Sequence, residues 1–240
     1  MGKVILVASG KGGVGKSVFS SNLGATFAER GLKVALVDMN IGLRNLDIYM
    51  GLENHIVFDV TDVLSGIVPL NKAMVKDKRF QALSLLATTQ RKEKFTFDAN
   101  QVLELYKRLK ETNDIIIIDG PAGVTEDLKL AATGVDMAVL ITTPEYVSLR
   151  DADMMDQVLR QRGISNRAYV VNKVNKSYMG TGVLPTVEMI TSVMKIPLLG
   201  VVQFDDAIHL AANAGVPIVY ETSNYIGRNF VKISDRILRY

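Results

Sequence analysis

A glycine-rich run near the start of the chain limits what this sequence can fold into. Residues 10–17 read Gly-Lys-Gly-Gly-Val-Gly-Lys-Ser, which fits the pattern G-x-x-x-x-G-K-[ST] and carries an extra lysine at Lys11. An apolar stretch at residues 4–8 precedes the run, and a helical pattern at residues 17–30 follows it. Glycines let successive N–H groups turn toward one anion, and a helix start adds its positive dipole end. The run therefore predicts a phosphate-binding loop.

The same pattern predicts roles for individual residues of the loop. We expect Lys16 to reach the β- and γ-phosphates of a nucleoside triphosphate, and the Ser17 hydroxyl to ligate Mg²⁺. The alternative is a glycine-rich strand-to-helix turn without a ligand, but such a turn does not need the lysine and the hydroxyl. The predicted nucleotide-binding residues of the loop are Gly10, Lys11, Gly12, Gly13, Val14, Gly15, Lys16, Ser17 and Val18.

Short apolar runs recur along the chain and alternate with helical patterns. Most of the runs are continuous, which is typical of strands buried on both faces of a parallel sheet. This order predicts an α/β fold with a doubly wound, mostly parallel sheet, helices on both faces, and one domain over residues 1–240. We expect strands at residues 4–8, 33–38, 83–87, 115–119, 137–142, 168–171 and 198–202, and helices at 17–30, 98–111, 126–133, 149–161 and 186–194. We also expect short helices at residues 57–64 and 70–76 and a mobile surface loop at 91–96.

Composition excludes several classes of protein. The 240 residues include no cysteine, which removes disulfides, thiolate metal sites and iron–sulfur ligation. The formal net charge of +3 permits weak, non-specific association with nucleic acid or anionic lipid without requiring it. No apolar stretch approaches the length of a membrane span, so we expect a cytoplasmic protein.

The last stretch of the chain has two interpretations. Ile226, Phe230, Ile233 and Ile237 share one face of a predicted helix, and basic residues occupy another face at Arg228, Lys232, Arg236 and Arg239. A basic amphipathic helix can lie on a membrane surface. We favour the second interpretation, in which the helix packs its apolar stripe on the sheet and leaves the basic face in water.

Two aspartates stand at the ends of predicted strands. Asp38 ends the stretch Val-Ala-Leu-Val-Asp, and Asp119 follows four isoleucines and precedes Gly-Pro-Ala-Gly. A carboxylate at the end of a buried apolar strand costs free energy of folding. Beside a phosphate loop, such a carboxylate usually binds Mg²⁺ directly or through water. Each aspartate alone could instead serve as a helix cap or turn residue. Together they predict a Mg²⁺ site made by Ser17, Asp38 and Asp119.

These motifs together resemble the MinD/ParA group of ATPases. The loop Lys-Gly-Gly-Val-Gly-Lys-Ser is similar to the deviant Walker A motif of that group. Residues 41–47 resemble its switch I segment, residues 119–123 its switch II, and residues 143–145 with 150–153 its next strand-end loop. The similarity runs the whole length, and the Gly-Leu-Arg-Asn-Leu-Asp run at residues 42–47 narrows it to MinD-like proteins.

The resemblance implies an ATP-dependent homodimer that binds ATP and Mg²⁺, hydrolyses ATP to ADP and phosphate, and serves in cell-division site placement. It implies that Lys11 reaches across a two-fold interface to the partner's phosphates. It also implies MinC- and MinE-like division regulators as partners, and peripheral contact with the inner face of the cell membrane if a C-terminal tail follows. A flagellar or pilus-placement ATPase and a ParA-type DNA-segregation ATPase, with non-specific nucleic-acid binding, are the alternatives within the group.

One departure from the family pattern concerns catalysis. The family has aspartate two positions after the first strand-end aspartate, where it orients the attacking water, and here that position is Asn40. An amide oxygen can hold a water but cannot accept a proton. The chain is then either a natural slow ATPase or an engineered form that traps the ATP dimer, and a non-hydrolysing ATP-gated scaffold is the alternative of another class. We expect tight Mg²⁺-ATP binding and weak turnover, with Lys11, Lys16 and Asn40 as the catalytic set.

The base-binding residues are predicted from weaker signals. The run Val-Asn-Lys-Val-Asn at residues 171–175 stands where a guanine-binding N-K-x-D would fall, but Asn175 replaces the aspartate. This substitution favours adenine, with Asn172 as its partner; the alternative is that Asn172 only caps a strand end. Val202 and Asp205 are expected beside the base, although Gln203 replaces the usual proline between them. We expect His55 and His209 to be ordinary surface or packing residues.

Overall fold

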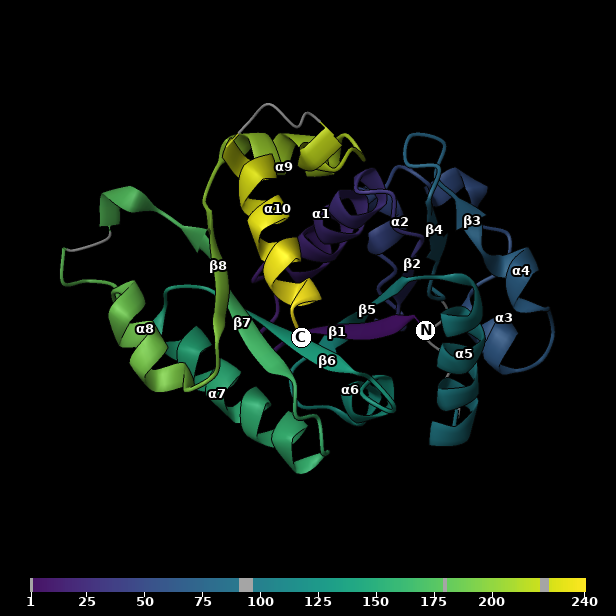
Figure 1. The fold of residues 1–240 in the computed structure, drawn as a ribbon, viewed down its shortest axis with the longest axis horizontal. Coiled ribbons are helices and arrows are strands. Elements are labelled where there is room, and N and C mark those ends of the chain that lie inside the picture. Colours follow the sequence, from purple (N-terminus) through teal and green to yellow (C-terminus); the bar gives the residue numbers. More distant parts are fainter. Residues whose placement is uncertain (1, 91–96, 179–180, 221–224) are drawn as a thin grey trace.

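The computed structural model describes residues 2–90, 97–178, 181–220 and 225–240. One eight-stranded sheet runs through it in the order β3-β4-β2-β5-β1-β6-β7-β8 (Figure 1). All neighbouring strands are parallel except the antiparallel pair β3–β4. The strands are β1 (Lys3–Ser9), β2 (Val34–Asp38), β3 (Val75–Lys76), β4 (Leu83–Leu86), β5 (Ile115–Ala122), β6 (Met137–Thr142), β7 (Arg167–Val174) and β8 (Leu198–Gln203).

Helices cover both faces of the sheet. They are α1 (Lys16–Glu29), α2 (Leu46–Tyr49), α3 (Val60–Leu64), α4 (Leu70–Ala73), α5 (Ala99–Thr112), α6 (Glu126–Ala131), α7 (Tyr146–Gln161), α8 (Val187–Met194), α9 (Asp206–Asn213) and α10 (Tyr225–Leu238), with short 3₁₀ turns η1 (Glu53–His55), η2 (Lys176–Tyr178) and η3 (Ile218–Tyr220). Figure 1 shows α1 and α10 on one side of the central strands and α6 and α7 on the other. The predicted doubly wound α/β fold is confirmed.

Alternation along each strand divides the core into two hydrophobic clusters. Val4 and Leu6 of β1 join the cluster of α3 to α8, whereas Ile5 and Val7 join the cluster of α1, α2 and α10. Successive side chains of a strand point to opposite faces of the sheet, so a strand that is buried on both faces needs a continuous apolar run. This requirement explains why the continuous runs located all seven expected strands.

The predictions of short elements were less accurate. The helix expected at residues 70–76 ends at Ala73, because Val75–Lys76 pair with β4 as an antiparallel edge strand. The helix expected at residues 57–64 begins at Val60, since the Asp59 carboxylate accepts from the N–H groups of Thr61 and Asp62 and caps it. α2 and α9 were not expected. The loop predicted at residues 91–96 lies outside the described residues.

The C-terminal helix α10 belongs to the core. Its apolar stripe is buried, and the ring of Phe230 lies 5.4 Å from the ring of Phe19 on α1. Ile233 packs on Gly200 of β8, where a Cβ atom would collide with it. Part of the polar side is also bound, since Arg236 donates to the Leu199 carbonyl at 2.6 Å. The favoured interpretation of this helix is confirmed. Within the described residues, no helix is both long and apolar enough to cross a membrane.

Substitutions on α10 test this placement. Replacing Phe230, which is 2 % exposed, with alanine is expected to lower the free energy of unfolding by about 3–5 kcal/mol, because it leaves a cavity against Phe19. The matched control Val231→Ala, on the exposed side of the same helix, is expected to change it by about 0.5 kcal/mol or less. Urea denaturation followed by circular dichroism measures both. Equal effects would show that α10 does not pack as described.

Candidate nucleotide-binding site

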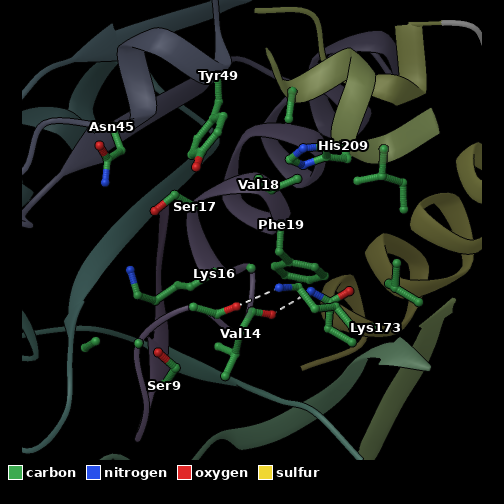
Figure 2. Close-up of a pocket in the computed structure, with 18 of the residues that line it drawn as sticks. Ser9, Val14, Lys16, Ser17, Val18, Phe19, Asn45, Tyr49, Lys173 and His209 are labelled. Carbon is green, nitrogen blue, oxygen red and sulfur yellow. Dashed lines mark hydrogen bonds between the residues drawn. The ribbon is translucent and has the colours of Figure 1, made fainter. Parts of the chain in front are cut away.

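The phosphate loop joins β1 to α1 at the carboxyl edge of the sheet. Gly13 and Gly15 have φ angles of 79° and 89°, left-handed values that glycine adopts without steric cost. α1 begins at Lys16, and its first N–H groups have no partner within the helix. A cavity of about 720 Å³ opens at this helix start (Figure 2). Of the predicted residues, 12–18, Asn40, Asn172, Val202 and Asp205 line it.

A buried cluster lies under the loop around the Asp119 carboxylate. Asp119 Oδ2 accepts from the Ser17 hydroxyl at 2.5 Å, and Oδ1 lies 3.3 Å from the Lys16 ammonium. Ser20, one turn further along α1, also donates to Oδ1, at 2.9 Å. Asp119 is 1 % exposed and Lys16 7 %, so water contributes little to neutralising either charge. The structure thus brings together three predicted site residues and adds Ser20, which the motif does not contain.

Asp38 occupies the corresponding position on the neighbouring strand. Asp38 and Asp119 are register partners of β2 and β5. Asp38 accepts from the backbone N–H groups of Asn40 at 2.9 Å and Leu46 at 3.3 Å. Burial, together with the nearby Asp119 carboxylate, raises the pKa of Asp38 to about 7. The two carboxylates at these adjacent strand ends therefore repel each other, and a nearby positive charge stabilises both.

These residues fit a magnesium ion. Hydroxyl and carboxylate oxygens are the ligands that Mg²⁺ prefers, and it is held by one or two carboxylates together with phosphate oxygens and water. Ser17 Oγ and the Asp119 carboxylate already touch, and Asp38 lies on the next strand. Among the described residues, no group of three or more histidine, cysteine, aspartate or glutamate residues is placed to hold a metal ion.

Lys11 lies apart from this cluster. Its ammonium binds Glu145 Oε2 at 3.1 Å, and about half of each side chain is exposed. Glu145 precedes α7, whose first two residues, Tyr146 and Val147, are also exposed. Gly10 and Lys11 do not line the cavity, whereas Lys16 does. The two lysines of the loop therefore face different surroundings, one on the rim and one inside.

Asn40 stands at the cavity wall in the position that the sequence predicts. Asn40 is one of the lining residues, and its backbone N–H donates to the Asp38 carboxylate at 2.9 Å. Asn45 and Tyr49, at the start and end of α2, line the same wall (Figure 2). Neither was predicted, because a four-residue helix after an irregular segment leaves little pattern in a sequence.

The opposite wall comes from β7, β8 and α9. Asn172 donates to the Val14 carbonyl at 2.7 Å, so its amide is anchored on the phosphate loop. Asp205 caps α9 through the Ala207 N–H and accepts from the Tyr225 hydroxyl, and these hydrogen bonds lower the pKa of Asp205. The bond to Asp205 raises the pKa of Tyr225 to about 12. Asp205 thus lines the cavity with its carboxylate already engaged.

Several residues of this wall were not predicted to belong to the site. Lys173 was not assigned a role, yet it lines the cavity and donates to the Gly13 carbonyl at 2.7 Å. His209, expected to be an ordinary surface or packing residue, is exposed and lines the cavity from α9. The aspartates at positions 205 and 206 are a helix-start signal that could have located α9. His55 lies in η1 and is exposed, as expected.

Comparisons with known proteins agree with this geometry. The family model described as "ParA: NUBPL iron-transfer P-loop NTPase" matches residues 1–238. The septum site-determining protein MinD of Bacillus subtilis is 41 % identical over 240 residues, which cover 99 % of this chain and 90 % of that protein. MinD of Helicobacter pylori is 37 % identical over 247 residues, covering 99 % and 91 %.

Solved structures give the same result. The MinC:MinD cell division complex of Aquifex aeolicus matches with a TM-score of 0.92 at 34 % identity, covering 99 % of this chain and 96 % of that one. MinD of Pyrococcus horikoshii, solved as a complex with Mg-ADP, matches with a TM-score of 0.89 at 29 % identity and the same coverage.

Two glycines of the loop provide a matched test of its packing. A Cβ atom at Gly10 would collide with the backbone carbonyl of Asp151, whereas one at Gly12 would meet no described atom within 4 Å, and neither glycine has a positive φ. Gly10→Ala is therefore expected to lower the unfolding free energy of the nucleotide-free protein by about 2 kcal/mol or more, and Gly12→Ala to leave it nearly unchanged. Thermal unfolding without nucleotide measures both. Comparable melting temperatures for the two variants would contradict the contact between the loop and Asp151.

Proposed function

Because the chain belongs to the ParA family of P-loop NTPases and, within it, to the MinD group of septum site-determining ATPases, we propose that residues 1–240 act as one nucleotide-binding domain of a dimeric switch. The protein is an ATPase of cell-division site placement that uses ATP and Mg²⁺. The observation that carries the proposal is the buried cluster of Lys16, Ser17 and Asp119 beneath the phosphate loop, at the opening of the cavity.

Nucleotide binding then exchanges the partners of this cluster. With nucleotide bound, Lys16 would pair with the β- and γ-phosphates in place of Asp119, and the Ser17 hydroxyl oxygen would help to hold Mg²⁺. Asp119 and Asp38 would be the carboxylates that hold the ion beside Ser17, and Mg²⁺ would supply charge neutralisation at the phosphates. The raised pKa of Asp38 supports this assignment, because a cation would relieve the repulsion between the two buried carboxylates.

The base lies against β7, β8 and α9. Asn172 offers Oδ1 to the exocyclic amino group of adenine, since its Nδ2 donates to Val14. Val202 supplies an apolar wall. The Asp205 carboxylate already accepts hydrogen bonds from Tyr225 and Ala207. Asp205 therefore contributes by capping and positioning α9, and not by contacting the base. These contacts favour adenine over guanine, which would need a carboxylate where Asn175 stands.

Lys11 acts in the partner's site. A half-exposed ion pair of this kind contributes about 1 kcal/mol or less, so the Lys11 ammonium can leave Glu145 at little cost. The exposed side chains of Tyr146 and Val147 beside it offer apolar surface to a second copy. ATP would hold two copies in an isologous dimer in which each Lys11 neutralises charge on the other copy's phosphates. Loss of the γ-phosphate releases the switch segments and the dimer.

The partners follow from this group of proteins. The Aquifex aeolicus relative was solved as a MinC:MinD complex, and we propose a MinC-like partner and a MinE-like regulator for this chain. A cytoplasmic location with peripheral contact at the inner face of the membrane is proposed with them. The apolar stripe of α10 is buried inside the fold. A segment other than α10 would therefore make the contact with the membrane.

Two lysine variants separate the roles within the loop. Lys11→Ala is expected to abolish ATP-dependent dimerisation while ADP binding to the monomer stays within about threefold of native, because Lys11 lies outside its own cavity. Lys16→Ala is expected to lose both. Light scattering and calorimetric titration measure the two properties, with the exposed Lys107→Ala as the control. ATP-dependent dimers of Lys11→Ala would contradict a role in the partner's site.

Asn40 sets the turnover rate. We expect Asn40→Asp to raise kcat by about tenfold or more, because a carboxylate orients the attacking water and accepts its proton, whereas an amide only orients it. The apparent affinity for ATP is expected to stay within about threefold, since Asn40 is part of the cavity wall and lies outside the phosphate loop. Steady-state phosphate release measures both parameters. The assignment is wrong if the native chain turns over as fast as the Asn40→Asp variant.

A further inference from the structure

The end of β7 carries a backbone conformation that its sequence does not favour. Lys173 has a φ of 57°, and the pairing of β7 with β8 shifts between Val171 and Val174. Left-handed backbone is uncommon for a residue with a side chain and costs about 1 kcal/mol or more. Such a conformation persists only where surrounding contacts hold it.

The side chains of Lys173 and its neighbour Asn172 contact backbone carbonyl groups of the phosphate loop. The Lys173 ammonium donates to the Gly13 carbonyl at 2.7 Å, and Asn172 Nδ2 donates to the next carbonyl, that of Val14, also at 2.7 Å (Figure 2). Two adjacent residues of one strand end thus hold two adjacent carbonyls of the loop. The left-handed turn at Lys173 lets neighbouring side chains, which would otherwise point to opposite faces, serve the same loop.

These carbonyl contacts fix where the loop's N–H groups point. The C=O and N–H of one planar trans peptide point in opposite directions. Holding the Gly13 carbonyl toward Lys173 therefore turns the Val14 N–H away from it, and holding the Val14 carbonyl turns the Gly15 N–H likewise. Amide groups turned inward in succession are what a phosphate loop uses to bind an anion.

The packing at Gly15 shows that the strand end and the loop are fitted to each other. Gly15 has a φ of 89°, and a Cβ atom there would collide with Asn172 Nδ2. The loop passes so close to β7 that only glycine fits at the contact. The same contact keeps Asn172 within reach of the Val14 carbonyl.

We propose that Lys173 is a positioning residue of the phosphate loop: by holding the Gly13 carbonyl, it orients the Val14 N–H toward the bound phosphates. The proposal rests on the proposed nucleotide site and adds a residue outside the loop motif to it. Lys173 then contributes to affinity for the phosphates through the loop, without contact with the base.

Calorimetric titration of the full chain with Mg-ADP and with Mg-pyrophosphate tests this role. Lys173→Met keeps the length of the side chain without a donor, and Lys173→Gly also removes the backbone strain, so one variant remains informative if the other fails to fold. Both are expected to weaken binding of the two ligands by more than about threefold and by similar factors. Lys173→Arg, which keeps a cationic donor, is expected to stay within about threefold of native.

Lys195 provides the matched control. It is an exposed lysine with a φ of 52° at the end of α8, so Lys195→Met repeats the chemical change in the same backbone conformation. We expect it to bind both ligands as the native chain does. Amide hydrogen exchange of residues 13–15 is expected to be faster in Lys173→Met and Lys173→Gly and unchanged in Lys195→Met.

The outcomes separate this inference from the proposed function. A native chain that binds no Mg-ADP would overturn the proposed function itself. If the native chain binds Mg-ADP, the inference is overturned when Lys173→Met and Lys173→Gly both bind with affinities within about threefold of native. It is also overturned when Lys173→Arg or Lys195→Met loses as much affinity as Lys173→Met. A third contradicting result is a loss of affinity for Mg-ADP without a loss for Mg-pyrophosphate. The last result would mean that Lys173 contacts the nucleoside and not the loop.

Discussion

The carboxylate of Asp119 is the group on which the rest of the site depends. It is buried at the end of β5 and holds Lys16, Ser17 and Ser20, all on the first turns of α1. A buried carboxylate without partners would cost several kcal/mol, so these contacts fix the start of α1 against the sheet. They also occupy the two groups that a nucleotide would need. In the proposed function, nucleotide binding would replace these partners of Lys16 and Ser17 by phosphate and Mg²⁺.

The position of this cluster follows from the register of the sheet. β2 and β5 are parallel and in register at Asp38 and Asp119, so both carboxylates reach the same edge as the phosphate loop after β1. In a parallel sheet with helices on both faces, the connections leave the carboxyl ends of the strands and pass to one face or the other. They leave a crevice at this edge of the sheet. The end of β7 adds Asn172 and Lys173, which contact carbonyl groups of the loop at that edge. One feature of the topology thus gathers residues that are far apart in the chain.

The two lysines of the loop differ because of where the fold places them. Lys16 lies inside, paired with Asp119, and Lys11 lies on the rim, paired with Glu145. Charge that is exposed and weakly held is available to another molecule, whereas charge that is buried is committed to its own site. The sequence motif and its resemblance already assign the two lysines different roles, and the difference in burial supports those separate roles.

The sequence by itself determined the parallel α/β fold, the phosphate loop and the strand-end aspartates, because each leaves a local signal: continuous apolar runs, glycine spacing, and a charge directly after a buried strand. The apolar stripe of α10 was equally local, since its periodicity predicted the buried face. Only the tertiary structure decided the edge strand Val75–Lys76, which exists through its partner β4, and the anchoring of the loop by Lys173, which depends on the approach of two segments about 160 residues apart. Such contacts have no local pattern, because the free energy that forms them comes from packing between distant parts of the chain.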